Sequence, residues 1–226
     1  MRNPFTAERP FANRADAAEQ LAAKLRKYRG RNPLILAIPR GAVPMGKIIA
    51  EQLQGELDVV LVHKLSAPDN REYAIGAMDE TGWSYLTPYA EEAGATDAYL
   101  LQEKARQLAM LVERRAQYTP LKAAADPAQR IAIVIDDGLA TGATMIAALH
   151  TVRARNPASL ICAIPVAPRT TLEQIRQDAD AVYCLHVPSR FVSVGHYYQD
   201  FTQVEDDEVI QILGGVAPAG SENQHQ

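Results

Sequence analysis

The sequence I-A-I-V-I-D-D-G-L-A-T-G-A-T, at residues 131–144, decides the fold. It opens with an apolar run rich in β-branched residues, which is typical of a parallel strand buried on both faces. Asp136 and Asp137 follow at the carboxyl end of this strand, where open α/β sheets bind their ligands. A small, hydroxyl-rich loop then leads into a helical pattern at 145–153. The stretch therefore predicts a strand–loop–helix unit with a ligand site at the loop.

The predicted loop suits a phosphate, because free N–H groups and the helix dipole at a helix N-terminus attract anions. Gly142 allows the backbone to approach a ligand closely, and Thr141 and Thr144 offer hydroxyl donors. Two carboxylates beside such a loop indicate a ligand that carries hydroxyls or a metal in addition to its phosphate. A phosphorylated sugar is such a ligand. Alternatively, Asp136 only ends the strand and Asp137 opens a turn, but turn chemistry does not explain the Thr-Gly-x-Thr that follows.

A second stretch repeats this arrangement earlier in the chain. Residues 34–38 predict a buried strand, and a helical pattern begins at Met45. Between them, Arg40 and Gly41 form a glycine turn in which the arginine can bind phosphate oxygens. The alternative is a plain tight turn.

Strands alternate with helical patterns along the chain, which predicts an α/β fold with a parallel sheet flanked by helices. The predicted core has five strands, at 34–38, 58–62, 131–135, 160–164 and 182–185. Residues 73–79 and 83–87 flank Glu80-Thr81-Gly82 and predict a hairpin. Residues 96–118 have the spacing of a long amphipathic helix.

Composition limits the classes of partner. With 226 residues, 47% of them hydrophobic, we expect one domain with a cap, or two small domains. A net charge of −4 and the lack of long basic stretches argue against nucleic acid or a membrane surface as the main partner. No apolar run is long enough to span a bilayer, and no leader pattern opens the chain. Cys162 and Cys184 lie in apolar runs and are expected to be buried free thiols. These features favour a cytoplasmic protein.

The loop residues Val134-Ile135-Asp136-Asp137 through Thr141-Gly142-Ala143-Thr144 resemble the phosphoribosyl-pyrophosphate loop of type I phosphoribosyltransferases, particularly its adenine-type version. From Phe11 to Phe201 the chain is similar to a bacterial group of predicted phosphoribosyltransferases whose acceptor is unassigned. The resemblance implies one domain over 1–209 and a tail at 210–226. Within that domain it implies a flap at about 65–87, and a small C-terminal hood formed by about 187–204 with the N-terminal arm.

The resemblance also implies an enzyme that moves ribose 5-phosphate from phosphoribosyl pyrophosphate to a nitrogenous base and releases pyrophosphate. Asp136 and Asp137 would bind the ribose hydroxyls, directly or through Mg²⁺. The terminal phosphate would be held by the loop residues Ala140, Thr141, Gly142, Ala143 and Thr144. The pyrophosphate would be held by Arg40, Gly41 and Lys64, with Lys64 expected at the end of the second core strand. The glycine turn of this family often holds a non-proline cis peptide.

The flap and the hood would serve the acceptor base. Ala140 stands where hypoxanthine–guanine enzymes carry an aspartate that handles a purine proton, so Glu72 and Glu80 of the flap are the candidate acids. Stacking on the base is expected from Phe191, and polar contacts are expected from hood residues that include Tyr197 and Asp200. The alternative for these hood residues is a hydrophobic hairpin or a dimer contact.

The main alternative function is a non-catalytic regulator or sensor that binds phosphoribosyl pyrophosphate. A Rossmann dehydrogenase is excluded, because no G-x-G-x-x-G follows the first strand. The sequence does not identify the acceptor base, because a fold does not determine a substrate. Dimers are common in the resembled family, so a homodimer is a further expectation.

Overall fold

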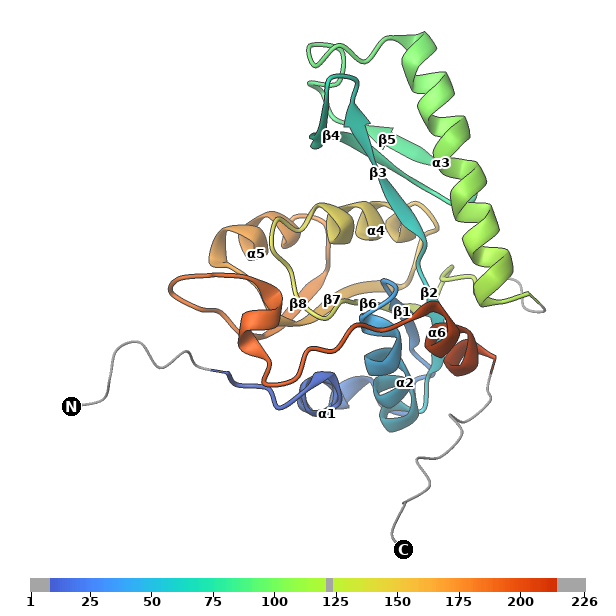
Figure 1. Ribbon diagram of the computed structural model, residues 1–226. Coiled ribbons are helices and arrows are strands. Elements are labelled where there is room, and N and C mark those ends of the chain that lie inside the picture. Colours follow the sequence, from blue (N-terminus) through green and yellow to red (C-terminus); the bar gives the residue numbers. More distant parts are fainter. Residues whose placement is uncertain (1–8, 121–123, 215–226) are drawn as a thin grey trace, which may run out of the picture.

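A five-stranded parallel sheet forms the centre of the protein (Figure 1). The computed structural model describes residues 9–120 and 124–214, apart from the side chains of Arg71 and Glu72. The strand order is β2 (Glu56–Val59), β1 (Leu34–Ala37), β6 (Ile131–Ile135), β7 (Ser159–Val166) and β8 (Ala181–His186). This confirms the predicted fold class and all five core strands. The second strand shifts most, because it spans Glu56–Val59 rather than 58–62, and the ends of the first, fourth and fifth strands move by one or two residues.

Helices cover both faces of this sheet, as Figure 1 shows. The helices α1 (Arg14–Lys24) and α2 (Ala42–Leu53) lie on one face, and α4 (Ala143–Arg153) and α5 (Arg169–Ile175) lie on the other. Successive residues of a strand point to opposite faces, so Ile133 joins the first apolar cluster and Val134 joins the second. All five residues of β6 are buried, which explains the unbroken apolar run in the sequence.

A separate antiparallel sheet lies where the flap is expected, and the name flap is kept for it; it projects from the core beside α3 (Asp97–Tyr118) (Figure 1). Its strands are β3 (Val62–Ala67), β4 (Asn70–Asp79) and β5 (Ser84–Leu86). The predicted hairpin is confirmed, because β4 and β5 pair through Gly76–Leu86 and Met78–Ser84. Thr96 caps α3 by accepting a hydrogen bond from the N–H of Tyr99.

The C-terminal segment crosses the core and meets the start of the chain. A single bridge joins Phe11 to Tyr198, and their rings lie 5.3 Å apart. Besides the short helices η1 (Arg26–Tyr28) and η2 (Val194–Tyr197), the chain forms α6 (Asp206–Leu213). The helix α6 was not predicted, and its second half falls where the sequence suggested a tail. It forms because Val209 is fully buried and the helix packs against α2 and α3.

Residues 215–226 of the predicted tail lie outside the described part of the chain. Within the described ranges, no helix combines the length and apolar character needed to cross a membrane.

Candidate functional site

The predicted phosphate loop has backbone N–H groups that the protein leaves available. Leu139 donates its N–H to the carbonyl of Val166, which fixes the start of the loop. In contrast, no N–H of residues 140–144 donates to any residue that the structure describes. The side chains of Thr141 and Thr144 are also exposed. A phosphate would therefore find free amides at the start of α4, together with the positive end of its dipole.

Gly142 has a different role from the one predicted. Its φ of +77° is in the left-handed region, and a Cβ there would lie 2.6 Å from Cγ2 of Thr171. The close approach that requires glycine is thus to α5 rather than to a ligand. The hydroxyl of Thr171 also donates to the carbonyl of Ala140 at 2.7 Å. Helix α5 therefore sets the shape of the loop.

The two aspartates lie between β6 and this loop, and they differ in their partners. Asp136 accepts the N–H of Asp137 at 2.8 Å. Oδ2 of Asp137 accepts hydrogen bonds from Nε and Nη2 of Arg14, at 2.9 Å and 2.8 Å. The backbone carbonyl of Asp137 accepts the hydroxyl of Tyr198 at 2.6 Å. Asp137 is thus held from two directions by residues of α1 and of the C-terminal segment.

Burial dominates the electrostatics of this pair. It raises the pKa of Asp136 well above the ordinary value, and the neighbouring charge of Asp137 raises it further. Burial also raises the pKa of Asp137, although the guanidinium of Arg14 opposes that rise. The site therefore disfavours two ionised carboxylates unless a cation or a hydrogen-bond donor compensates them.

The second glycine turn lies against the two aspartates. Gly41 precedes α2, and a Cβ on it would lie 2.0 Å from Oδ2 of Asp137. The expected non-proline cis peptide is present, between Pro39 and Arg40. A cavity of 380 Å³ opens here, lined by Arg14, Arg40, Gly41, Asp137, Phe201, Gln203 and Val204. Two guanidinium groups and one carboxylate thus face a common space.

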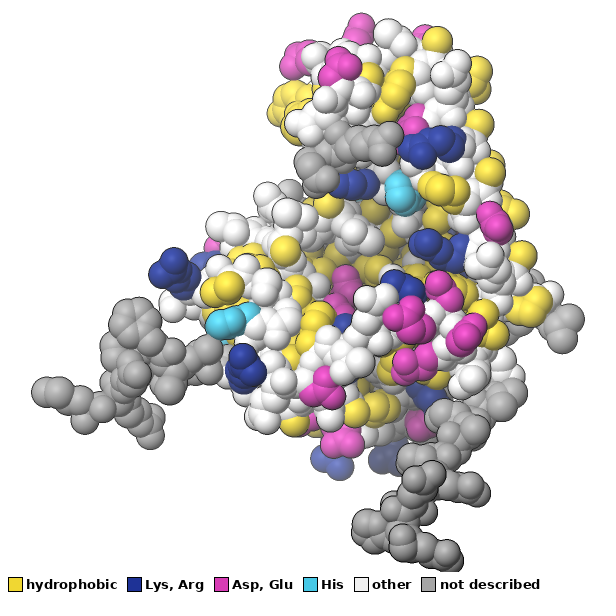
Figure 2. Space-filling model, in the orientation of Figure 1, with side chains coloured by type: hydrophobic (Ala, Val, Ile, Leu, Met, Phe, Trp, Pro, Cys, Tyr) yellow, Lys and Arg dark blue, Asp and Glu magenta, His cyan; other side chains and the backbone are white. Residues whose placement is uncertain are grey.

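Arg40 meets acidic residues at the start of α6. Its Nη1 lies 3.3 Å from Glu205 and 3.5 Å from Asp206. Figure 2 shows acidic side chains gathered over this end of α6. Arg40 remains 36% exposed, so these surface ion pairs are weak and an anion could displace them.

Lys64 does not lie at the end of a core strand, which corrects the prediction. The chain leaves the core sheet after Val59, and Lys64 pairs with Ala77 inside the flap. It lines a cavity of 530 Å³ between β3 and α3, together with His63 and Arg106. Burial lowers the pKa of His63 in this cavity. A role for Lys64 in binding pyrophosphate therefore depends on the flap.

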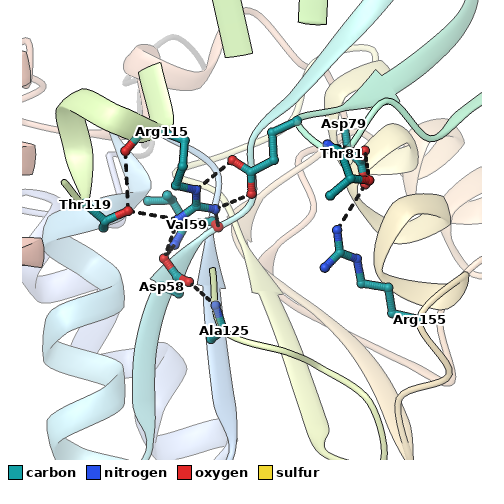
Figure 3. Close-up of polar contacts among 9 residues, drawn as sticks. Asp58, Val59, Asp79, Thr81, Arg115, Thr119, Ala125 and Arg155 are labelled. Carbon is teal, nitrogen blue, oxygen red and sulfur yellow. Dashed lines mark hydrogen bonds and ion pairs between the residues drawn. The ribbon is translucent and has the colours of Figure 1, made fainter. Parts of the chain in front are cut away.

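Glu80 does not lie beside the loop either, and its predicted role in proton transfer is withdrawn. Its carboxylate accepts two hydrogen bonds from the guanidinium of Arg115, each at 2.6 Å, and Figure 3 shows this guanidinium beside Asp58. The same guanidinium binds Oδ1 of the buried Asp58 at 2.8 Å. Glu80 also lines a small cavity with Thr151, near the carboxyl end of α4, whereas the loop lies at the amino end. This ion-pair cluster anchors the flap to β2 and occupies both carboxylate oxygens of Glu80.

The other flap candidate, Glu72, belongs to β4, but its side chain lies outside the described part of the structure.

The hood candidates make local contacts. Phe191 stacks on Tyr197 with ring centroids 5.7 Å apart, and the hydroxyl of Tyr197 donates to the carbonyl of Arg190. The carboxylate of Asp200 accepts the N–H and the hydroxyl of Thr202. Phe191 and Tyr197 thus pack on each other, and the structure shows no strand within the described residues 187–204, so the hairpin alternative is not observed.

Sequence reasoning assigned no role to Arg14, and it did not pair Arg40 with α6. Arg14 also lies 3.8 Å above the ring of Phe201 and donates to the carbonyl of Thr202. The available signal was the Phe11-x-Asn13-Arg14 segment, in which Asn13 caps α1 and so fixes where Arg14 begins the helix. Nothing in that segment indicates that Arg14 reaches a residue 123 positions away.

The site fits Mg²⁺ only together with a ligand. Within the described residues, no three side chains of His, Cys, Asp or Glu converge on one point. Asp136 and Asp137 provide hard oxygen donors, and Mg²⁺ commonly takes one or two carboxylates and completes its shell with phosphate oxygens and water. A substrate rich in phosphate would supply the remaining ligands.

Comparison with known proteins gives consistent matches. Residues 11–199 match the family model described as "Phosphoribosyl transferase domain". Two Mycobacterium tuberculosis proteins, whose names carry the words phosphoribosyl transferase, are each 37% identical over 204 residues. These matches cover 90% of this chain and 46% of each relative, so the chain spans about half their length. The crystal structure of TT1426 from Thermus thermophilus is 40% identical, with a TM-score of 0.83. That match covers 92% of this chain and 99% of the other.

Proposed function

This chain belongs to the phosphoribosyl transferase domain family, and on that basis we propose that it transfers ribose 5-phosphate from phosphoribosyl pyrophosphate to a nitrogenous base. In this reaction a nitrogen of the base bonds to the anomeric carbon, the bond from that carbon to the pyrophosphate oxygen breaks, and pyrophosphate leaves. The observation that carries the proposal is the contact between two loops. The acids after β6, followed by free loop amides, lie against the glycine turn that carries Arg40.

Each part of the substrate has a matching group in the proposal. The amides and hydroxyls of residues 140–144 bind the 5-phosphate. Asp136 and Asp137 accept hydrogen bonds from the ribose hydroxyls, directly or through the metal. Arg40 and the backbone at Gly41 bind the pyrophosphate, which exchanges the weak contacts of Arg40 with α6 for contacts with a stronger anion. When bound, Mg²⁺ supplies charge stabilisation and orientation to the leaving group.

The flap completes the proposal by excluding water, which would compete with the base for the activated carbon. The flap rests on α4, where the rings of Tyr85 and His150 stack with centroids 4.5 Å apart. The residue that handles the acceptor proton remains open to test, with Glu72 as the remaining flap candidate. A role of Asp200 in contacting the base also stays a proposal.

The activity is tested by measuring pyrophosphate release with phosphoribosyl pyrophosphate, Mg²⁺ and a panel of purine and pyrimidine bases. We expect release with at least one base and a loss of at least about tenfold in Asp137→Asn, because a hydrogen bond to a charged acceptor is removed. The matched control is Asp126→Asn, which neutralises an exposed acid in the connector before β6. Full activity in Asp137→Asn would remove the assigned role.

Binding measurements separate catalysis from the alternative of a regulator or sensor. Calorimetry that detects phosphoribosyl pyrophosphate binding, combined with no release on any base, would favour a sensor. A protein that does not bind phosphoribosyl pyrophosphate at all would overturn both functions. The match to a family described as "Phosphoribosyl transferase domain" favours the enzyme.

Two expectations about context also remain proposals. A homodimer is supported only by the frequency of dimers in the resembled family, and sedimentation equilibrium would test it. A cytoplasmic location is supported by the free thiols of Cys162 and Cys184, and cell fractionation would test it.

A further inference from the structure

We propose that Arg14 is a positioning residue that holds Asp137 by one oxygen and leaves the other oxygen free to accept a ribose hydroxyl. This inference rests on the proposed function and deepens it. It concerns a residue of α1 that neither of the two predicted binding loops contains.

The geometry of the pair is asymmetric. Both Nε and Nη2 of Arg14 bind the same atom, Oδ2 of Asp137. Gly41 approaches that oxygen closely as well, so little room is left around Oδ2. Among the described residues, none donates a hydrogen bond to Oδ1 of Asp137. The side chain of Asp137 is 16% exposed and lines the cavity that it shares with Arg14 and Arg40. Oδ1 is therefore the oxygen left for a ligand.

The guanidinium of Arg14 is itself fixed on every side. Its third nitrogen, Nη1, donates to the carbonyl of Thr202 at 2.5 Å. Its flat face stacks on Phe201, and only 13% of the side chain is exposed. A planar guanidinium can satisfy the carboxylate, the carbonyl and the ring at once, whereas an ammonium group cannot. The chain has thus built a rigid support for one carboxylate.

The support matters because two acids lie side by side here, and Arg14 is the cation in direct contact with the carboxylate of Asp137. Arg40, from the turn before α2, lines the same cavity. Removing Arg14 should therefore let the carboxylate of Asp137 turn away from the orientation that leaves Oδ1 free for a ligand.

The test is calorimetric titration with phosphoribosyl pyrophosphate and Mg²⁺ at pH 7, with wild type, Arg14→Gln and Arg14→Lys. The matched control is Arg26→Gln, which removes an exposed arginine in η1 from the same end of the chain and should bind as wild type does. We expect Arg14→Gln to bind at least about tenfold more weakly, because the charge-assisted contact is lost. Arg14→Lys keeps the charge but cannot hold Oδ2 through the planar fork, so it should bind more weakly than wild type and more tightly than Arg14→Gln.

Each outcome supports or overturns either the proposed function or the role of Arg14. A wild-type protein that fails to bind overturns the proposed function, and this inference with it. If wild type binds and Arg14→Gln matches it in affinity, the role of Arg14 alone is overturned. Tighter binding by Arg14→Gln would also overturn it, because Arg14 would then block the site. Should Arg14→Gln not fold, Arg14→Lys decides, and wild-type affinity in that variant would refute the need for the guanidinium.

Discussion

Gly41→Ala gives the sharpest test of the contact between the two loops. The backbone of Gly41 has φ −56° and ψ −31°, which alanine adopts without strain. The added Cβ, however, would lie 2.0 Å from Oδ2 of Asp137 and 3.1 Å from Nη2 of Arg14. Real Cβ atoms essentially never come within 3.0 Å of another heavy atom, so the carboxylate must retreat by about 1 Å. That movement breaks the present geometry of the pair.

The size of the effect follows from the two hydrogen bonds between Arg14 and Asp137. Hydrogen bonds at 2.8 Å and 2.9 Å that lengthen by about 1 Å no longer count as hydrogen bonds. Losing a bond to a charged group costs about 1.5–3 kcal/mol, which corresponds to roughly 10- to 100-fold in affinity for phosphoribosyl pyrophosphate. Overpacking of this kind typically lowers the free energy of unfolding by about 1–3 kcal/mol. Calorimetry and urea denaturation measure the two effects separately.

Two further variants separate the clash with Asp137 from a general loss of stability. Gly46→Ala makes the same substitution in α2, but its Cβ would meet Cδ1 of Leu57 at 2.6 Å, an apolar contact away from the acids. It should lower stability without weakening binding to the folded protein. In a double-mutant cycle, Gly41→Ala should cost little stability once Asp137→Ala has removed the clashing oxygen. Wild-type affinity in Gly41→Ala, or equal losses in both backgrounds of the cycle, would refute the reasoning.

Three further predictions concern the supports of the site. Arg115→Ala leaves buried carboxylates without their cation and should lower the free energy of unfolding by about 3–5 kcal/mol in urea, whereas Arg106→Ala, at a side chain that is 57% exposed, should leave the curve unchanged. Tyr198→Phe removes the hydroxyl that binds the carbonyl of Asp137, and it should cost about 1 kcal/mol in the same assay. Burial raises the pKa of Asp136, so Asp136→Asn should gain stability relative to wild type as the pH rises from 4 to 8, and parallel curves would contradict this.

Local sequence pattern was enough to predict the core sheet and both loops. An apolar run of five residues followed by two acids identifies β6 and its carboxyl end, because burial on both faces requires such a run. The glycine turn before α2 could be identified in the same way. In each case the signal lies within about ten consecutive residues.

The pattern failed where one apolar run serves two elements. Residues 57–63 have the pattern of a single strand, but Val60 and Leu61 lie between β2 and β3, and the chain passes there from the core sheet to the flap. Both residues are buried, so hydrophobicity does not reveal the change of direction. This is why Lys64 was assigned to the wrong sheet.

Contacts between segments far apart in the chain could not be predicted from the sequence. Arg14 lies 123 residues from Asp137, and Arg40 lies 165 residues from Glu205. Nothing in the spacing of an arginine near the N-terminus indicates which of many acids it will meet. Glu80 illustrates the same limit, since its pairing with Arg115 depends on how α3 packs against the flap.

The carboxylates at the end of β6 show how function opposes stability at this site. Because burial raises the pKa of Asp136 and Asp137, the stability that these groups contribute is fully present below the unfolded pKa and is lost as the pH rises through the folded pKa. A ligand that donates hydroxyls, or that brings a divalent cation, needs the opposite, ionised form. Arg14 offsets part of this conflict by direct contact with Asp137, and its charge acts on Asp136 only at a distance, where a backbone N–H is the hydrogen-bond donor. A metal-bound substrate would complete the compensation, so binding should release protons, and the number released should fall as the pH rises.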